Sequence, residues 1–342
     1  MPKFKPNWPL LAGLRYLLAV TVCLYHSASV IRDGTADYYS CLGPSAAVAI
    51  FFVISGISMR HSFEGEPAGF LRRRFWRIAP LYWVGCIGSF LPFLIWGSPY
   101  RVMVSLSEFI SLDMAPFRYF AIKFVGLYPL LFHAKSEAFN GALWSVGVES
   151  AFYLAVPVMS RLPRRYLWCA VIASAILRAF IYPKHSAWSL YAGEFCYFGL
   201  GWMVMDYHRK TWFIAAGAVI TAATAVVVIG LRGETFGPVL ALLGWVILMF
   251  SDRVQVPEKY RKGLSYLGDL SFPLYVLNMP FCFCILPLSL PILYTAPILV
   301  VAYASVIAAV LLHTIDRPLR RFGREPLLRR RPALEPVLAE AG

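Results

Sequence analysis

Two ionisable residues in the first apolar segment of the sequence have a spacing that could serve chemistry. Arg15 and His26 lie eleven residues apart within an apolar run at residues 10–29. In an α-helix this spacing separates them by about 16 Å along the axis but only about 20° around it, so both project from one face. Ionisable groups in such segments are costly and usually functional, and an imidazole with an unperturbed pKa of about 6.5 suits general-base catalysis. The structural alternative is that Arg15 snorkels and His26 only packs.

A carboxylate, Glu149, lies in a later apolar segment at residues 143–159. If the first segment crosses a membrane outward and this one crosses inward, His26 lies about 5 Å and Glu149 about 9 Å below the outer surface. The two side chains would then meet if their helices adjoin, and the carboxylate would orient the imidazole and stabilise its cationic form. A structural hydrogen bond to a neighbouring helix is the alternative role of Glu149.

Basic and small residues mark a third candidate region. The stretch before the third apolar segment ends in four arginines, namely Arg72, Arg73, Arg74 and Arg77. Guanidinium groups can bind phosphates bidentately, although charge runs at segment ends are also routine determinants of topology. Within the second apolar segment, Ser55 and Gly56 could line a cavity or allow a close approach of two helices.

The elements that must position these residues are membrane-spanning helices. Of the 342 residues, 59% are hydrophobic and only 15% are charged, whereas a soluble domain carries about 25% charged residues. A helix needs about 20 mostly apolar residues to cross the hydrocarbon core. We therefore expect an all-α, polytopic membrane protein with ten spans. The expected spans are residues 10–29, 44–59, 79–96, 143–159, 166–182, 188–205, 211–231, 236–250, 266–289 and 291–312.

The distribution of basic residues predicts the topology. With ten spans and a cytoplasmic N-terminus, 23 of the 32 Lys and Arg residues fall on the cytoplasmic side and 7 on the outer side, as the positive-inside rule requires. Counting residues 97–142 as a crossing would reverse most later loops, so we expect an external loop with re-entrant or interfacial helices there. Both termini are then cytoplasmic, with a membrane domain at residues 1–322 and a basic tail at 323–342 drawn to anionic lipid.

Charge and cysteine usage exclude other classes of protein. The formal net charge is +14, but the basic residues lie in short loops between apolar segments, so nucleic acid is not an expected partner. The seven cysteines have neither metal-ligand spacing nor the pattern of a disulfide framework. We expect no metal and no tightly bound cofactor. The N-terminal run resembles a signal peptide, but Arg15, His26 and the many later apolar segments argue against cleavage.

Taken in order, four sequence features resemble the acyltransferase 3 family of bacterial membrane acyltransferases. They are the Arg-x10-His of Arg15 and His26, the Phe-Phe-Val-Ile-Ser-Gly run ending in Ser55 and Gly56, the Arg-x-x-Arg of Arg74 and Arg77, and the Trp-Ser-x-x-x-Glu-x-x-Phe-Tyr run from Trp144 through Glu149. Two later stretches, beginning at Leu267 and Asp316, are similar to the family's last-helix and tail signatures. The resemblance covers about residues 10–322.

The resemblance implies a ten-helix domain in the inner (plasma) membrane. It implies transfer of an acyl group, usually acetyl, from cytoplasmic coenzyme A to a glycan at or beyond the outer face. Carried over, His26 is the catalytic histidine, Arg15 its motif partner, and Arg74 and Arg77 the donor-side arginines. The chain departs from the family at Asn278, where a histidine is common and an asparagine cannot act as a base, and at Asp316, where glutamate is usual.

We therefore expect acyl transfer from acetyl-CoA, or another acyl-CoA, to a sugar hydroxyl. His26 removes the hydroxyl proton, and Glu149 supports it. The residues expected on the donor side are Arg72, Arg74, Arg77, Ser55 and Gly56. On the acceptor-substrate side we expect Trp144 and Asn278, which with Arg15 are candidates to stabilise the oxyanion.

Two alternatives from other classes remain at this point. In a transporter of a lipid-linked sugar or an anion, the intramembrane Arg, His and Glu would form a substrate or proton path. Such transporters often contain inverted repeats, and the sequence shows none. A structural subunit of an envelope complex is the other alternative. Neither of them would form a CoA-dependent product.

Overall fold

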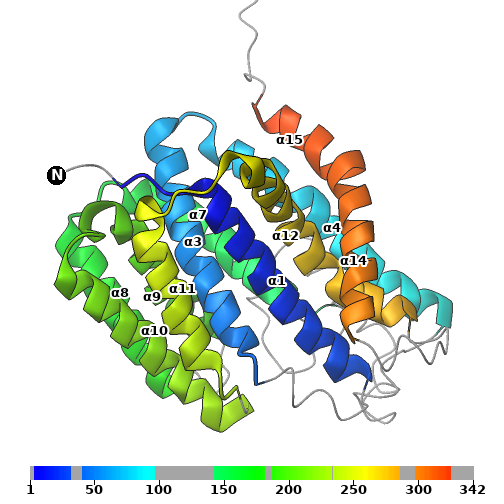
Figure 1. Ribbon diagram of the computed structural model, residues 1–342, viewed down its shortest axis with the longest axis horizontal. Coiled ribbons are helices and arrows are strands. Elements are labelled where there is room, and N and C mark those ends of the chain that lie inside the picture. The colour runs from blue at the N-terminus through cyan, green and yellow to red at the C-terminus, as the bar shows by residue number, and fades with distance from the viewer. Residues whose placement is uncertain are drawn as a thin grey trace, which may run out of the picture.

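The computed structural model describes residues 4–31, 41–96, 140, 142–181, 187–232, 234–285 and 297–324. Within these residues the regular structure is helical, as expected, and ten long α-helices pack into one bundle (Figure 1). They are α1 (Trp8–Ile31), α3 (Pro44–Gly65), α4 (Phe70–Trp96), α7 (Leu143–Met159), α8 (Arg164–Ile181), α9 (Ala187–Tyr207), α10 (Thr211–Arg232), α11 (Gly237–Phe250), α12 (Glu258–Ile285) and α14 (Pro297–Leu311). A 3-10 turn, η5 (Ser251–Arg253), follows α11, and a π-helical turn, η7 (Leu312–Asp316), leads into the short helix α15 (Arg317–Arg324).

Each of the ten expected spans corresponds to one of the long helices. The main difference is that two helices begin earlier than their apolar segments. Helix α4 begins at Phe70 and contains the arginine cluster, which lies before the expected span at residues 79–96. Helix α12 begins at Glu258, before the expected span at residues 266–289. Both added stretches are rich in charged residues, so hydropathy leaves them out, yet Lys, Arg and Glu are good helix formers.

Three of the described helices have the length and composition of membrane spans. Among the described residues, Trp8–Ala28, Pro44–Gly65 and Pro297–Arg324 form helices that are long and apolar enough to span a membrane. The helices at Leu143–Met159 and Thr211–Val227 are apolar but shorter. The ten-span topology and the cytoplasmic termini stay predictions. Apart from residues 140 and 142, the expected external loop at 97–142 lies outside the described residues, as does the tail beyond residue 324.

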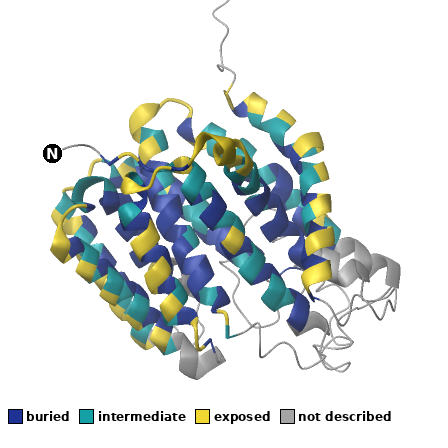
Figure 2. Ribbon diagram, in the orientation of Figure 1, coloured by how far each residue is buried: buried dark blue, intermediate teal, exposed yellow. Residues whose placement is uncertain are grey.

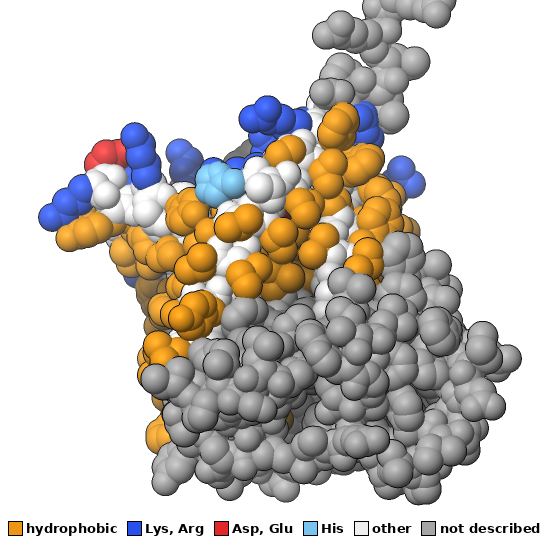
Figure 3. Space-filling view, turned by 90° about the vertical axis from the view of Figure 1, so that its right-hand side faces the viewer, with side chains coloured by type: hydrophobic (Ala, Val, Ile, Leu, Met, Phe, Trp, Pro, Cys, Tyr) orange, Lys and Arg blue, Asp and Glu red, His pale blue; other side chains and the backbone are white. Residues whose placement is uncertain are grey.

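The surface of the bundle is apolar along its sides and basic at one end. Outward side chains such as Phe180, Leu154, Val219 and Ile298 are 66–75% exposed. In the face seen in Figure 3, hydrophobic side chains lie below a rim of Lys and Arg. A surface with this much exposed apolar area is typical of contact with lipid.

The interior of the bundle relies on glycines where helices approach closely. A Cβ on Gly56 would lie 2.2 Å from the carbonyl oxygen of Phe198, and one on Gly201 would lie 2.0 Å from that of Val53. Only glycine permits this contact between α3 and α9, whose facing sides are buried (Figure 2). The structure thus gives Gly56 a packing role, and its expected donor-side role stays a prediction.

Helices α1 and α12 form the most extensive helix pair of the bundle, and they run in the same direction. A Cβ on Gly268 would lie 2.4 Å from the Cβ of Ala12, near the start of α1. Towards the far end of the same pair, His26 contacts Asn278. The parallel arrangement agrees with the expected topology, in which the first and ninth spans both run outward.

Candidate active site

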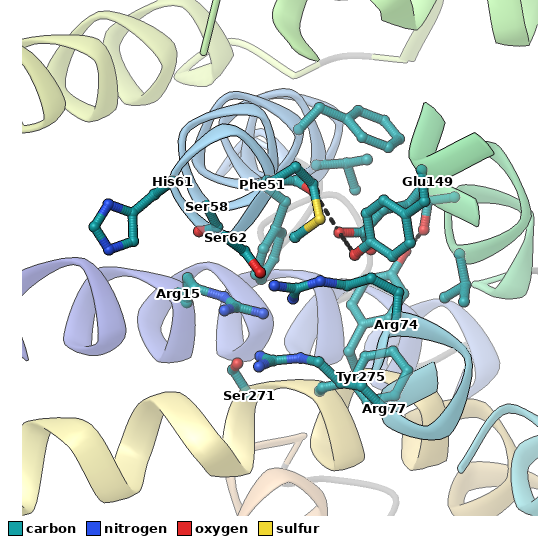
Figure 4. Close-up of a pocket in the computed structure, with 18 of the residues that line it drawn as sticks. Arg15, Phe51, Ser58, His61, Ser62, Arg74, Arg77, Glu149, Ser271 and Tyr275 are labelled. Atoms are coloured by element: carbon teal, nitrogen blue, oxygen red, sulfur yellow. Dashed lines mark hydrogen bonds between the residues drawn. The ribbon is translucent and has the colours of Figure 1, made fainter. Parts of the chain in front are cut away.

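A cavity of about 280 Å³ opens between α1, α3, α4, α7 and α12. Its polar lining comes from all five helices, and Figure 4 shows how these side chains face the shared space. The polar and ionisable lining residues are Arg15, Ser55, Ser58, His61, Ser62, Arg74, Arg77, Ser145, Glu149, Tyr153, Ser271 and Tyr275. Residues from all four matched sequence motifs therefore lie together, although His26 of the first motif is not among them.

Three guanidinium groups converge in this cavity. Arg15 reaches it from α1, and Arg74 and Arg77, one turn apart on α4, reach it from the opposite wall (Figure 4). The Nε atom of Arg74 is buried and has no hydrogen-bond partner among the described residues. Among the described residues that line the cavity, Glu149 is the one with a carboxylate. The cavity therefore carries an excess of positive charge and suits an anionic ligand.

The other two arginines of the cluster do not line the cavity, because their side chains bind groups outside it. Arg72 donates a hydrogen bond to the carbonyl oxygen of Phe322 in α15. Arg73 donates to the carbonyl oxygens of Glu66 and Ala68 and forms an ion pair with the Glu66 carboxylate at 3.1 Å. These two arginines hold the α3–α4 turn and the tail helix, so the donor-side role expected for Arg72 has no support from its position.

The Glu149 carboxylate accepts hydrogen bonds from two hydroxyl groups, one in α3 and one in its own helix, α7. The Ser55 hydroxyl donates to its Oε1 atom at 2.6 Å, and the Tyr153 hydroxyl donates to the same atom at 2.5 Å. In the part of the chain that the structure describes, Glu149 forms no hydrogen bond to His26. The His26–Glu149 contact considered from the sequence is thus not formed, because α7 packs against α3, α4 and α9, whereas α1 packs against α12, α3 and α14.

His26 is paired instead with a residue that lies 252 positions further along the chain. Its Nδ1 atom lies 3.0 Å from Oδ1 of Asn278, and the Asn278 amide donates to the carbonyl oxygen of Tyr275 at 2.6 Å. Tyr275 also lines the cavity, so the His26–Asn278 pair lies about one helical turn beyond the cavity wall. The pattern of residues in a single sequence gives no signal for this contact between two distant segments.

Other residues of the site could have been found from helical spacing. Tyr153 is four positions after Glu149 and lies on the same face of α7. Ser145 follows the expected Trp144, and its hydroxyl is 2.7 Å from that of Tyr275. Trp144 itself packs edge-on against Phe52, with ring centroids 6.4 Å apart. Its neighbour Ser145, rather than Trp144, faces the cavity.

A second opening of about 200 Å³ shares Trp8, Arg15, Ser58 and Arg77 with the first cavity. The tail helix lies at this end of the bundle (Figure 1). Asp269, which lines the second opening, forms ion pairs with two arginines of that helix. The partners are Arg320 at 3.1 Å and Arg317 at 3.4 Å, and Arg320 also pairs with Asp316. The two later sequence signatures thus meet as one ion-pair network beside the cavity.

Comparisons with known proteins identify the family to which the chain is similar. A family model described as an acyltransferase domain matches residues 10–314. Acyltransferase MdmB of Streptomyces mycarofaciens is 33% identical over 198 residues, which cover 52% of this chain and 47% of that protein. Nodulation protein 10 of Rhizobium leguminosarum bv. viciae is 26% identical over 274 residues, which cover 70% of this chain and 72% of that protein. The matched region spans about half the length of the first relative. No solved structure matches.

Proposed function

The chain belongs to the acyltransferase 3 family and is an acyltransferase, and from this premise we propose that it transfers an acyl group from cytoplasmic acyl-CoA to a hydroxyl of a cell-surface or exported glycan. Acetyl-CoA is the proposed donor. The proposed location is the inner membrane, which the chain crosses several times.

The observation that carries the proposal is the cavity with three convergent guanidinium groups. Arg15, Arg74 and Arg77 outnumber the single described carboxylate of the lining, so the cavity favours a ligand with several negative charges. Acyl-CoA carries a pyrophosphate and a further phosphate, and guanidinium groups bind such oxygens by charge-assisted hydrogen bonds. The donor phosphates would lie at this end, and the pantetheine arm would extend past Tyr275 towards His26.

His26 provides the base for the proposed reaction. The acceptor oxygen forms a bond to the thioester carbonyl carbon while Nε2 of His26 takes the hydroxyl proton. The tetrahedral intermediate then expels the CoA sulfur as its C–S bond breaks, and the leaving thiolate recovers the proton from the imidazolium. The products are the ester and free CoA, and His26 returns to its neutral form. General-base help of this kind contributes about 10²- to 10⁴-fold in rate.

The proposed orientation follows from the charge distribution. The arginines of α4, the start of α12 and α15 lie at the end of the bundle that carries the basic rim in Figure 3. The positive-inside rule places such a rim in the cytoplasm, where acyl-CoA is available. Along α1, His26 lies about 16 Å beyond Arg15, towards the opposite face of the membrane, where an exported glycan would arrive.

Transfer of label tests this proposal directly. Membranes that contain the protein are incubated with acetyl-CoA labelled in the acetyl group and with the cell's own glycans, and the glycan fraction is assayed. We expect labelled glycan with the wild-type protein and none with His26→Gln. If wild-type membranes with acceptor glycan present gave no labelled product, the chain would fit a transporter or a structural subunit instead.

A further inference from the structure

The contact between His26 and Asn278 defines the protonation of the imidazole. A backbone carbonyl oxygen can only accept, so the Asn278 amide atom that lies 2.6 Å from the carbonyl of Tyr275 must be the nitrogen. The amide oxygen therefore faces Nδ1 of His26 at 3.0 Å. Since an amide oxygen also only accepts, Nδ1 must carry the proton. In a neutral imidazole the other nitrogen, Nε2, is then unprotonated, which is the form that a general base requires.

We propose that Asn278 is a positioning residue for acyl transfer, which holds His26 in the tautomer and orientation that make Nε2 the base. This inference rests on the proposed function, in which His26 takes the proton of the acceptor hydroxyl. It replaces the substrate-side role expected for Asn278 from the sequence, because both ends of the amide are engaged inside the protein. A third group that orients the base is a general feature of base-activated acyl transfer.

The surroundings of Asn278 are rigid enough for this role. Its side chain is completely buried, and it lies on the helix that packs most extensively against α1. A Cβ on Gly268 would lie 2.4 Å from the Cβ of Ala12, and one on Gly13 would lie 2.8 Å from Cδ2 of Leu264. Helices in such close contact cannot slide past each other without a clash. The register that brings Asn278 to His26 is therefore fixed.

The electrostatic surroundings also favour an amide as the partner. The described side chains of the helices packed on the second half of α1, at residues 44–57, 270–279 and 297–311, include no Asp, Glu, Lys or Arg. Besides His26, the titratable side chains described in these stretches and in that half of α1 are Cys23, Tyr25, Tyr275 and Tyr303. A neutral amide orients the ring here without placing an uncompensated charge in an apolar part of the bundle.

Steady-state kinetics of the purified protein in nanodiscs, with acetyl-CoA and the acceptor glycan, tests the inference. Asn278→Leu removes the hydrogen bond, and we expect kcat to fall by about 10- to 100-fold because the ring can adopt the wrong tautomer. The KM for acetyl-CoA should stay within about twofold, since the phosphates bind elsewhere. Asn278→Asp keeps an acceptor for Nδ1–H but favours the imidazolium. It should retain turnover and move the acidic limb of the pH–rate profile upward by about one unit.

Asn140 provides a matched control. Its buried amide donates to the carbonyl oxygen of Val276 at 3.1 Å, one residue beyond Tyr275 in α12, and among the described residues it forms no hydrogen bond to His26. This carbonyl has lost its helical partner because Pro280 has no N–H group. Asn140→Leu should therefore lower thermal stability, with kcat of the folded protein within about threefold of wild type.

The possible outcomes distinguish a failure of the positioning role of Asn278 from a failure of the proposed acyl-transfer function. If His26→Gln is inactive while Asn278→Leu keeps the wild-type kcat, the positioning role is wrong and the base assignment stands. An Asn140→Leu variant that loses kcat as strongly as Asn278→Leu would reduce the role of Asn278 to packing. If Asn278→Leu fails to fold, Asn278→Asp decides alone, and an unchanged acidic limb contradicts the inference. A fully active His26→Gln overturns the proposed function itself.

Discussion

At the scale of single residues, the site contains a cavity with three arginines and, about one helical turn beyond its wall, the uncharged pair of His26 and Asn278. The sequence alone identified Arg15, Arg74, Arg77 and Glu149 as candidates, because charged groups within or beside apolar segments stand out by type, and the structure brings all four to one cavity. It did not predict their partners. The sequence suggested that the Glu149 carboxylate contacts His26, whereas in the structure His26 contacts Asn278. A single sequence does not reveal this contact, because it depends on how the helices of the whole bundle pack.

Removal of one cavity arginine should weaken donor binding selectively. Arg77→Gln should raise the KM for acetyl-CoA by about 10- to 100-fold, since charge-assisted hydrogen bonds contribute about 1.5–3 kcal/mol. Arg73→Gln is the matched control, because the side chain of Arg73 binds Glu66 and Ala68 outside the cavity. Its KM should stay within about twofold of wild type. Equal effects of the two substitutions would show that the cluster acts only through its total charge.

Glu149 should influence the donor rather than the base. Glu149→Gln keeps an acceptor for Ser55 and Tyr153 but removes the negative charge beside the arginines. We expect the acidic limb of the pH–rate profile to stay where it is in the wild type, and the KM for acetyl-CoA to be unchanged or lower. The measurement is a pH series of kcat and KM. A shift of the limb by one unit would restore Glu149 as the electrostatic partner of His26.

At the scale of elements, hydropathy predicted the ten long helices but not their full lengths or neighbours. The polar first turns of α4 and α12 continue their helices beyond the apolar segments. In α4, Arg74 and Arg77 line the cavity, whereas Arg72 binds Phe322 and Arg73 binds Glu66 and Ala68. Which helices adjoin is set by small residues such as Gly56 and Gly268, whose partners a single sequence does not reveal.

The α3–α9 contact should tolerate no added side chain. In Gly56→Ala the new Cβ would lie 2.2 Å from a backbone oxygen, so the two helices must separate. We expect a lower unfolding temperature in detergent, measured by calorimetry. Gly263→Ala is the control, because no atom lies within 4 Å of its added Cβ. It should stabilise the protein by about 0.5–1 kcal/mol through helix propensity. A Gly56→Ala variant as stable as wild type would contradict this packing.

An ion-pair network should make the contact between α3, α8 and α9 depend on pH. Asp206, in the expected cytoplasmic loop, forms pairs with Arg60 at 2.7 Å and with Arg164 at 2.6 Å. Burial opposes the charged form, but the hydrogen bonds and charges of Arg60 and Arg164 outweigh it and lower the pKa of Asp206 below its usual value. This stabilisation is present above the unfolded-state pKa of about 3.9 and is lost as the pH falls through the lower folded-state pKa.

Asp206→Asn tests the network. Its unfolding temperature should lie below that of wild type at pH 7, and the difference should shrink as the pH falls below about 4, where Asp206 of the unfolded wild-type chain takes up a proton. Thermal unfolding of both proteins at pH 7 and pH 3 measures this. A difference that stayed constant with pH would show that Asp206 contributes by packing rather than by its charge.

At the scale of the whole molecule, the bundle presents apolar sides, a basic end and a cavity that opens near that end. The all-helical class was predicted from the length of the apolar segments, and the exposed apolar sides were predicted from the high ratio of apolar to charged residues. The cavity could not be predicted in the same way, since its walls combine five helices from positions 15 to 275 of the chain. Their convergence depends on the tertiary packing of the bundle.

The most direct test measures binding and transfer in the same nanodisc preparation, for wild type, His26→Gln and Arg77→Gln. Calorimetric titration gives the Kd for acetyl-CoA, and release of free CoA thiol with acceptor glycan present gives the transfer rate. We predict that His26→Gln binds acetyl-CoA as tightly as wild type but transfers nothing, while Arg77→Gln binds it about 10- to 100-fold more weakly. Transfer by His26→Gln at the wild-type rate, or no binding of acetyl-CoA by the wild type, would contradict the account.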